Sequence, residues 1–153
     1  MATQRNRGGD AVSNLMLATF KLNGAFLAAG DRISAPSGLT AARWQVLGTL
    51  MWDDMTVSGV ARKMGLSRQA VQRIANVLAE EGLITFLDNP NDRRAKLASA
   101  TKASREAIHS LAERQYAWAN TTAEGIDPEE IEKAVEVLNR IIFSSTQKHD
   151  ASD

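Results

Sequence analysis

The sequence contains no cysteine, which excludes disulfide bonds, thiol redox chemistry and thiolate metal sites. Its two histidines lie far apart in the chain and have no partners at the spacing of a metal site. It also lacks a glycine-rich phosphate loop and a nucleophile elbow. We therefore expect neither an enzyme nor a protein with a metal ion or another cofactor.

Long apolar runs are absent as well, since no segment reaches the roughly 20 residues that span a bilayer. The first residues, MATQRNRGGD, precede an apolar stretch in the manner of a signal peptide. Asp10, Asn14 and Lys21 interrupt that stretch, and its period is helical. With 44% hydrophobic and 24% charged residues, the composition predicts one cytoplasmic domain over residues 1–153, without membrane contact.

The chain carries no net charge, but its charges are unevenly distributed. From Thr56 to Arg105 there are nine basic and four acidic residues, whereas from Glu106 onward there are four basic and ten acidic ones. A basic middle segment indicates a face that binds a polyanion. Random scatter of surface charge is the alternative, because an asymmetry of this size also arises without a function.

The most informative segment, Val57–Asn76, has the pattern of two short helices joined by a tight turn. Ala61 supplies the small side chain that the helix crossing needs, and Gly65 supplies the turn. Val71 and Ile74 fall where the second helix needs core anchors. The pattern predicts a helix-turn-helix, with a plain helical hairpin as the alternative.

The second of these helices presents polar side chains on its free side: Arg68, Gln69, Gln72 and Arg73. Arginine and glutamine are the side chains that read guanine and adenine edges in a major groove. This face is therefore the first candidate for contact with DNA.

A β-hairpin is predicted after the helix-turn-helix. Residues 83–87 (LITFL) and 96–101 (KLASAT) have strand composition, and the polar turn segment 88–94 separates them. The hairpin therefore has a basic tip.

Helices are predicted on both sides of this central region. Apolar residues three and four apart predict a helix over residues 11–29 and a last helix after Asp127-Pro128. Ser34–Gly38 is predicted to be a linker, followed by a helix with a buried face. Predicted N-terminal caps are Thr40, Thr56, Ser67, Thr101 and Asp127, and predicted C-terminal stops are Gly82 and Gly125.

These elements resemble the multiple antibiotic resistance regulator (MarR) family from about residue 11 to 145. The similarity is carried by Leu39-Thr40, Arg43-Trp44, Val46-Leu47, Thr56-Val57-Ser58, the run Gly65–Val71, Glu81–Ile84 and, most specifically, Asp92–Leu97. The resemblance implies a mainly α fold with a small β-hairpin wing. In it, a winged helix-turn-helix over 39–101 is flanked by N- and C-terminal dimerisation helices over 11–30 and 102–145.

The resemblance also implies a function. Such proteins are homodimeric regulators that bind double-stranded DNA at pseudo-palindromic operators, usually as repressors released by a small aromatic or phenolic effector. An effector-free regulator or an activator of the same fold is the alternative. A relative that acts through protein contacts is a third class, against which Arg68, Gln69, Gln72 and Arg94 argue.

Carried over to this sequence, the resemblance places Ser67, Arg68, Gln69, Gln72 and Arg73 in the major groove. It places Arg94 in the adjacent minor groove, where a narrow, negative groove attracts a guanidinium. Asp92 would hold that guanidinium by a charge-assisted hydrogen bond, with a turn-forming role as the alternative. Arg93 is expected to contact a phosphate.

The resemblance further places an effector pocket at the junction between the helical flank and the winged motif. Trp44, Leu47 and Met51 would line it, with Arg43 or His109 as a polar handle for a phenolate or carboxylate. Core packing is the alternative for the first three, and solvent exposure is the alternative for His109.

Overall fold

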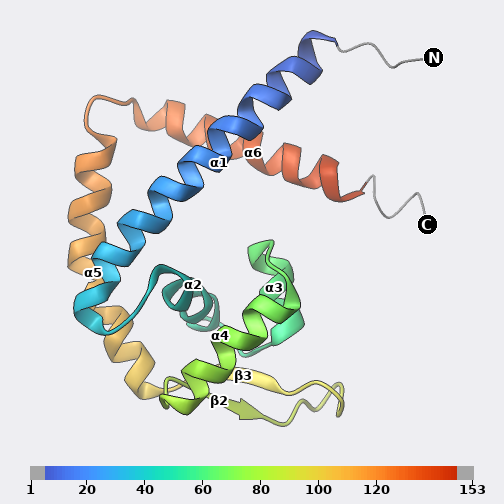
Figure 1. The fold of residues 1–153 in the computed structure, drawn as a ribbon, viewed down its shortest axis with the longest axis vertical. Coiled ribbons are helices and arrows are strands. Elements are labelled where there is room, and N and C mark those ends of the chain that lie inside the picture. Colours follow the sequence, from blue (N-terminus) through green and yellow to red (C-terminus); the bar gives the residue numbers. More distant parts are fainter. Residues whose placement is uncertain (1–5, 148–153) are drawn as a thin grey trace. The chain divides into compact units, whose positions relative to one another are not determined.

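The computed structural model describes residues 6–147, and the chain forms two compact units with the boundary between Glu113 and Arg114. The elements of the first unit are α1 (Arg7–Ser34), the 3₁₀ turn η1 (Ala35–Ser37), α2 (Ala41–Leu50), β1 (Met55–Thr56), α3 (Val57–Met64), α4 (Arg68–Glu80), β2 (Ile84–Leu87) and β3 (Leu97–Ala100). α5 (Lys102–Ala123) runs from the first unit into the second, which also contains α6 (Pro128–Gln147). The expected mainly helical fold with a β-hairpin wing is confirmed (Figure 1).

Hydroxyl caps start the helices of the central motif where the sequence predicts them. The side chain of Thr40 accepts a hydrogen bond from the backbone N–H of Arg43 at 3.3 Å, and Thr56 accepts one from Gly59 at 3.0 Å. Each bond satisfies an N–H that the first turn of a helix leaves without an intrahelical partner. α3 is therefore capped in the same way as α2.

The sheet has three antiparallel strands in the order β1-β3-β2, one more than the sequence predicts. β2 and β3 pair with Ile84 opposite Ala100, and β1 adds only Met55 and Thr56 at the other edge of β3. A two-residue strand shows no alternation of its own, so its pairing was not predicted. It ties the start of α3 to the base of the wing.

The core of the first unit is built around α2. Val46, Leu47 and Leu50 are all at most 1% exposed, and α2 has neighbours in α1, α3, α4 and β3. Leu78 of α4 and Leu111 of α5 are also buried, at 0% and 2% exposed. Burying each such side chain contributes roughly 1.5–3 kcal/mol.

The connection between α1 and α2 is tighter than the linker that the sequence predicts over Ser34–Gly38. α1 continues to Ser34, whose buried hydroxyl donates to the carbonyl of Leu39 at 3.0 Å. The carboxylate of Asp31 accepts the N–H of Ala41 at 2.7 Å, which helps to cap α2. At Gly30, an added Cβ would lie 2.8 Å from the Cβ of Ala41. Glycine therefore allows α1 to approach the start of α2 closely.

In the second unit, the predicted helix boundary is confirmed. Gly125 has a φ of 78°, and the side chain of Asp127 accepts the N–H of Glu129 at 3.0 Å ahead of Pro128. None of the residues of α6 is buried. No helix within residues 6–147 is both long and apolar enough to cross a membrane, and no group of His, Asp and Glu side chains there is arranged to hold a metal ion.

We expect Gly30→Ala to lower the free energy of unfolding by about 1–3 kcal/mol, because the new methyl group overpacks the contact with Ala41. Gly48→Ala is the matched control, since no atom lies within 4 Å of a Cβ built there. Alanine should stabilise the helix at that site by up to about 1 kcal/mol. Urea denaturation followed by circular dichroism measures the free energy of unfolding of both variants. Equal stabilisation by the two substitutions would contradict the close contact between Gly30 and Ala41.

Candidate nucleic-acid interface

The helix-turn-helix consists of α3 and α4, and the turn between them is set by one glycine and one serine. Gly65 adopts a left-handed conformation with φ 65°, which a residue with a Cβ rarely does. Ser67 then caps α4 by accepting the N–H of Ala70 at 3.1 Å. As a result, the first turn of α4 presents Arg68 and Gln69 to solvent, while Gln72 is half-buried.

Two consecutive turns shape the loop of the wing. The side chain of Asn89 accepts the N–H of Asn91 at 3.0 Å, and the carboxylate of Asp92 accepts the backbone N–H of Arg94 at 2.9 Å. The carbonyl of Asp92 also accepts the N–H of Ala95 at 3.2 Å. The carboxylate of Asp92 thus acts on the backbone that carries Arg94, which is the turn-forming alternative. Within residues 6–147 it forms no ion pair with a guanidinium, so that role stays a prediction.

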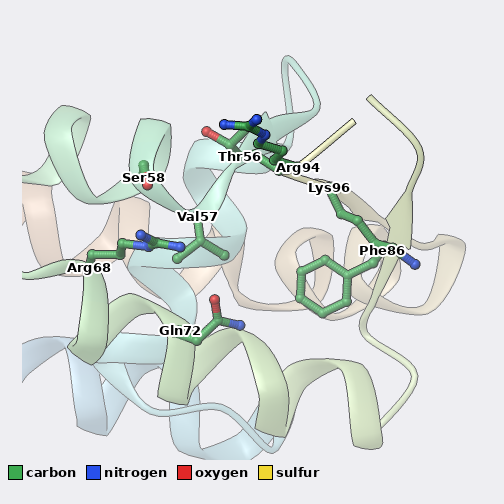
Figure 2. Close-up of a pocket in the computed structure, with 9 residues that line it drawn as sticks. Thr56, Val57, Ser58, Arg68, Gln72, Phe86, Arg94 and Lys96 are labelled. Atoms are coloured by element: carbon green, nitrogen blue, oxygen red, sulfur yellow. The ribbon is translucent and has the colours of Figure 1, made fainter. Parts of the chain in front are cut away.

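A concavity of about 240 Å³ lies between α4, the start of α3 and the wing. We call it the cationic cup; it is lined by Thr56, Val57, Ser58, Arg68, Gln72, Phe86, Arg94, Ala95 and Lys96. In Figure 2, Arg68 and Gln72 rise from α4, with Phe86 and Lys96 across from them on the wing and Arg94 beside Thr56. The cup therefore joins the predicted reading helix to the predicted wing contact.

The electrostatics of the cationic cup favour an anion. Three of its side chains, those of Arg68, Arg94 and Lys96, are cationic, and none of its lining residues is acidic. None of these three forms an ion pair within the described residues 6–147. A concave surface with one sign of charge concentrates counter-ions. The hydroxyls of Thr56 and Ser58 add hydrogen-bonding groups suited to phosphate oxygens.

The two neighbouring arginines of the wing line different surfaces. Arg94 lines the cationic cup, whereas Arg93 lines a separate, wider concavity of about 440 Å³ with Asp88, Asn89 and Pro90. Lys96 borders both. The distinct roles predicted for the two arginines are compatible with this arrangement.

Arg73 lies apart from the cup, on the side of α4 that faces α2. It lines a shallow apolar groove with Ile74, Val77 and Arg43. Arg43 is itself engaged, because its guanidinium forms a bidentate ion pair with the carboxylate of Glu81, with both N–O distances at 3.0 Å. This pair links the start of α2 to the end of α4.

The structure does not gather the five predicted effector residues around one pocket in its described part. Trp44 lines a cleft of about 240 Å³ between α1 and α2, with Phe26, Gly30, Ala41, Gln45 and Gly48. Leu47 is fully buried in the core, which is the packing alternative. Met51 follows α2 and its carbonyl accepts a hydrogen bond from Arg105, while His109 is exposed on α5.

Six of the nine residues that line the cup were not predicted to be site residues: Thr56, Val57, Ser58, Phe86, Ala95 and Lys96. Thr56 was predicted to be a helix cap. A signal existed for Phe86, because strand alternation puts it on the same face of β2 as the buried Ile84. Lys96 gave no signal beyond its charge, since its neighbourhood depends on how the wing folds back towards α4.

Comparisons with known proteins point to one family and one fold. A sequence model described as the MarR family matches residues 37–95. An uncharacterised protein of Mycobacterium tuberculosis is 33% identical over 135 residues, which cover 88% of this chain and 94% of that protein. The transcriptional activatory protein BadR of Rhodopseudomonas palustris is 31% identical over 88 residues, 55% of this chain and 50% of BadR.

Among solved structures, CouR from Rhodococcus jostii RHA1 bound to p-coumaroyl-CoA is similar with a TM-score of 0.74 and 27% identity. The match covers 84% of this chain and 92% of CouR. Structures described as MarR-family transcriptional regulators share the fold over most of their length.

Substitutions at Asp92 and Arg94 test how the wing contributes to DNA binding. We expect Arg94→Ala to weaken DNA binding on the order of tenfold, more than any other single substitution in the hairpin. Asp92→Ala should weaken binding several-fold because the turn loses its side-chain hydrogen bond, and the double substitution should be little worse than Arg94→Ala. Asp92→Asn should preserve binding, since an asparagine side chain makes the same turn.

The measurement is the dissociation constant for one selected DNA duplex at one fixed salt concentration. If Asp92→Asn were as harmful as Asp92→Ala, the carboxylate charge would be required. That result would favour direct ordering of the Arg94 guanidinium over the turn role.

Proposed function

Because this chain belongs to the MarR family of transcriptional regulators, we propose that it binds operator DNA as a homodimeric repressor that a small aromatic or phenolic effector releases. The cationic cup is the observation that supports the DNA-binding part of this proposal. Its three cations come from α4 and the wing and have no acidic neighbour in the lining.

The cup fits the path of a DNA strand. When α4 lies in the major groove and the wing reaches the adjacent minor groove, the phosphate backbone that separates the two grooves has to pass between them. Lys96 would neutralise a phosphate there, while Arg94 would reach the minor groove on one side of this path and Arg68 the major groove on the other. Ser67, Gln69 and Gln72 would face the bases, while the lateral position of Arg73 suits a contact with a flanking phosphate. Arg93 would contact a phosphate from the second concavity, which it lines with Asp88, Asn89 and Pro90.

Exposed apolar side chains on α1 and α6 support the proposed homodimer. In α1, Met16, Leu17 and Phe20 are 50–65% exposed, and in α6, Ile142 and Phe143 are 58% and 64% exposed. Monomeric soluble proteins rarely present so many large apolar side chains on neighbouring turns. A two-fold dimer through these helices would place the two α4 helices for half-sites about one duplex turn apart.

The cleft beside Trp44 is the best candidate for the effector in one protomer. Its lining is predominantly apolar and aromatic, with Trp44 and Phe26 for an aromatic ring and Gln45 as a polar group. Arg43 is already paired with Glu81, so Gln45 replaces it as the expected polar handle. CouR, a structural relative, is bound to p-coumaroyl-CoA, which supports an aromatic ligand class.

Activation of transcription is the second candidate. The relative BadR is named as a transcriptional activatory protein, and its match covers 55% of this chain. A reporter gene fused to the selected operator distinguishes repression from activation. Loss of the regulator raises expression for a repressor and lowers it for an activator.

Selection of bound duplexes from random DNA tests the DNA-binding proposal. We expect inverted repeats with half-sites about 10 base pairs apart, and a dimeric mass by light scattering at micromolar concentration. Lys96→Ala should weaken binding to all sequences and reduce the salt slope by about 1. Lys102→Ala is the matched control, because its side chain is 91% exposed, pairs with Glu106 and lies outside the cup. A monomeric mass, or a selection without any enriched sequence, would contradict the proposal.

Effector release is tested with p-coumaroyl-CoA and free p-coumarate as probes. A ligand that binds only the folded state raises the unfolding midpoint, and linkage requires that it also lower operator affinity if the operator lowers ligand affinity. In the Trp44→Ala variant, the ligand should cause little rise in the unfolding midpoint and little loss of operator affinity. Trp52→Ala, at an 85% exposed tryptophan just beyond α2 and outside the cleft, should keep them. If these and other aromatic acids leave operator binding unchanged, the effector-free alternative is favoured.

A further inference from the structure

We propose that the ion pair between Arg43 and Glu81 sets the rotation of α4 about its own axis, and thereby directs the polar face of α4 at the bases. Glu81 is then a positioning residue, because it caps the far end of α4 and acts through Arg43 without touching DNA. This inference rests on the proposed function, since it assumes that α4 reads DNA.

Packing holds α4 against the core along one line of buried residues. Val71, Ala75 and Leu78 are at most 1% exposed, and their spacing of four and three residues puts them on one side of the helix. Burial of apolar surface favours contact but has no preferred direction. A helix held along one line therefore keeps its distance from the core, while a small rotation about its long axis costs little.

On the side that faces α2, packing leaves room for such a rotation. A shallow groove of about 290 Å³ lies there, and its lining includes Ala70, Ile74 and Val77 of α4 and Ala42 of α2. Glu81 follows Val77 by four residues, so it continues the line of groove residues along α4. The contact that Glu81 makes is therefore placed where it can oppose a turn of α4 towards or away from α2.

The ion pair joins α4 to a firmly held point of α2. Nη1 of Arg43 donates to Oε2 of Glu81, and Nη2 of Arg43 lies the same 3.0 Å from Oε1. Two parallel contacts between planar groups restrict direction as well as distance. The start of α2 is itself anchored, because Thr40 caps the N–H of Arg43 and Asp31 of α1 accepts the N–H of Ala41. The pair thus fixes one edge of α4.

A small rotation is enough to disturb base reading. Side chains of a helix end about 5–6 Å from its axis, so a turn of about 10° displaces them by about 1 Å. Arg68 and Gln72 line the cationic cup and not the groove, so they would move with the polar face. Hydrogen bonds to base edges tolerate little displacement, whereas attraction to phosphates falls slowly with distance. Loss of the pair should therefore reduce sequence preference more than general affinity for DNA.

The experiment removes one carboxylate and compares the result with its neighbour. Glu81→Ala breaks the pair. Glu80→Ala is the matched control, because it removes the same charge at the same end of α4, and Glu80 is exposed and forms no ion pair within residues 6–147. Dissociation constants are measured at one salt concentration for the selected operator and for an unrelated duplex of equal length.

Unfolding midpoints separate positioning from a loss of stability. The pair is partly exposed, so Glu81→Ala should lower the midpoint by no more than about 4 °C. All variants should therefore be folded at the temperature of the binding measurements.

We expect Glu81→Ala to lower the ratio of operator affinity to unrelated-duplex affinity roughly fivefold or more. Glu80→Ala should keep this ratio. For both variants, binding to the unrelated duplex should be unchanged or tighter, because removal of an acidic side chain strengthens the attraction to DNA. A weaker affinity of Glu81→Ala for the operator therefore has the opposite sign to the direct effect of charge.

A double-mutant cycle assigns the effect to the pair. Arg43→Ala should lower the ratio about as much as Glu81→Ala does, and the combined variant should lower it no further.

Four results would overturn the inference. An unchanged ratio for Glu81→Ala would show that packing alone sets the rotation of α4, while leaving the proposed function intact. An equal loss in Glu80→Ala would assign the effect to charge at this end of the helix, and additive losses at Arg43 and Glu81 would show that the two act separately. If the wild type does not prefer its selected operator, α4 reads no sequence, and the proposed function fails together with the inference.

Discussion

Burial of the short helix α2 is the constraint on which the other contacts depend. Ten residues have to pack against α1, α3, α4 and β3 at once, and three of them are at most 1% exposed. That packing fixes where α4 lies relative to the rest of the first unit. The approach of α1 is possible only because Gly30 has no side chain opposite Ala41. A change of volume in this core would therefore move the reading helix as well as lower stability.

Polar contacts also hold the far end of α4, beyond the buried Leu78. Glu81 forms its bidentate pair with Arg43 of α2, and the hydroxyl of Thr101 donates to the carbonyl of Gly82 at 2.8 Å. The first contact ties α4 to the helix beside the proposed effector cleft, and the second ties it to the end of the wing. Since the pair is partly exposed, it contributes about 1 kcal/mol or less to stability. Its main consequence is geometric, because it couples the orientation of α4 to that of α2.

Charge in the cationic cup opposes folding and favours the proposed binding of DNA. Arg68, Arg94 and Lys96 line one concavity without an acidic partner in that lining, so they repel each other in the free protein. Water and salt screen this repulsion, so it is small, and the free energy gained by packing the core offsets it. A DNA backbone passing through the cup would relieve it.

Local chemistry allowed much of the fold to be predicted. The caps at Thr40, Thr56 and Ser67 and the left-handed glycines Gly65 and Gly82 depend on only a few neighbouring residues, and all are present in the structure. The connection over Ser34–Gly38 lies where the sequence predicts it, but α1 reaches Ser34 and does not end near residue 29. Hydrogen bonds from Ser34 to Leu39 and from Ala41 to Asp31 hold this last part of α1 against the chain that follows. The short strand β1 was missed because its pairing partner lies some forty residues further along the chain.

The sequence by itself determined which residues form α4 and which form the wing, since periodicity and turn chemistry are local properties. Only the tertiary structure decided which side chains share a surface. It placed Arg94 and Arg93 on different concavities, paired Arg43 with Glu81, and buried Leu47 in the core. The bond from the backbone N–H of Arg94 to the carboxylate of Asp92 is a local contact, and it corresponds to one of the two roles predicted for Asp92. The other outcomes depend on distances set by packing between elements, and spacing along the chain carries no information about them.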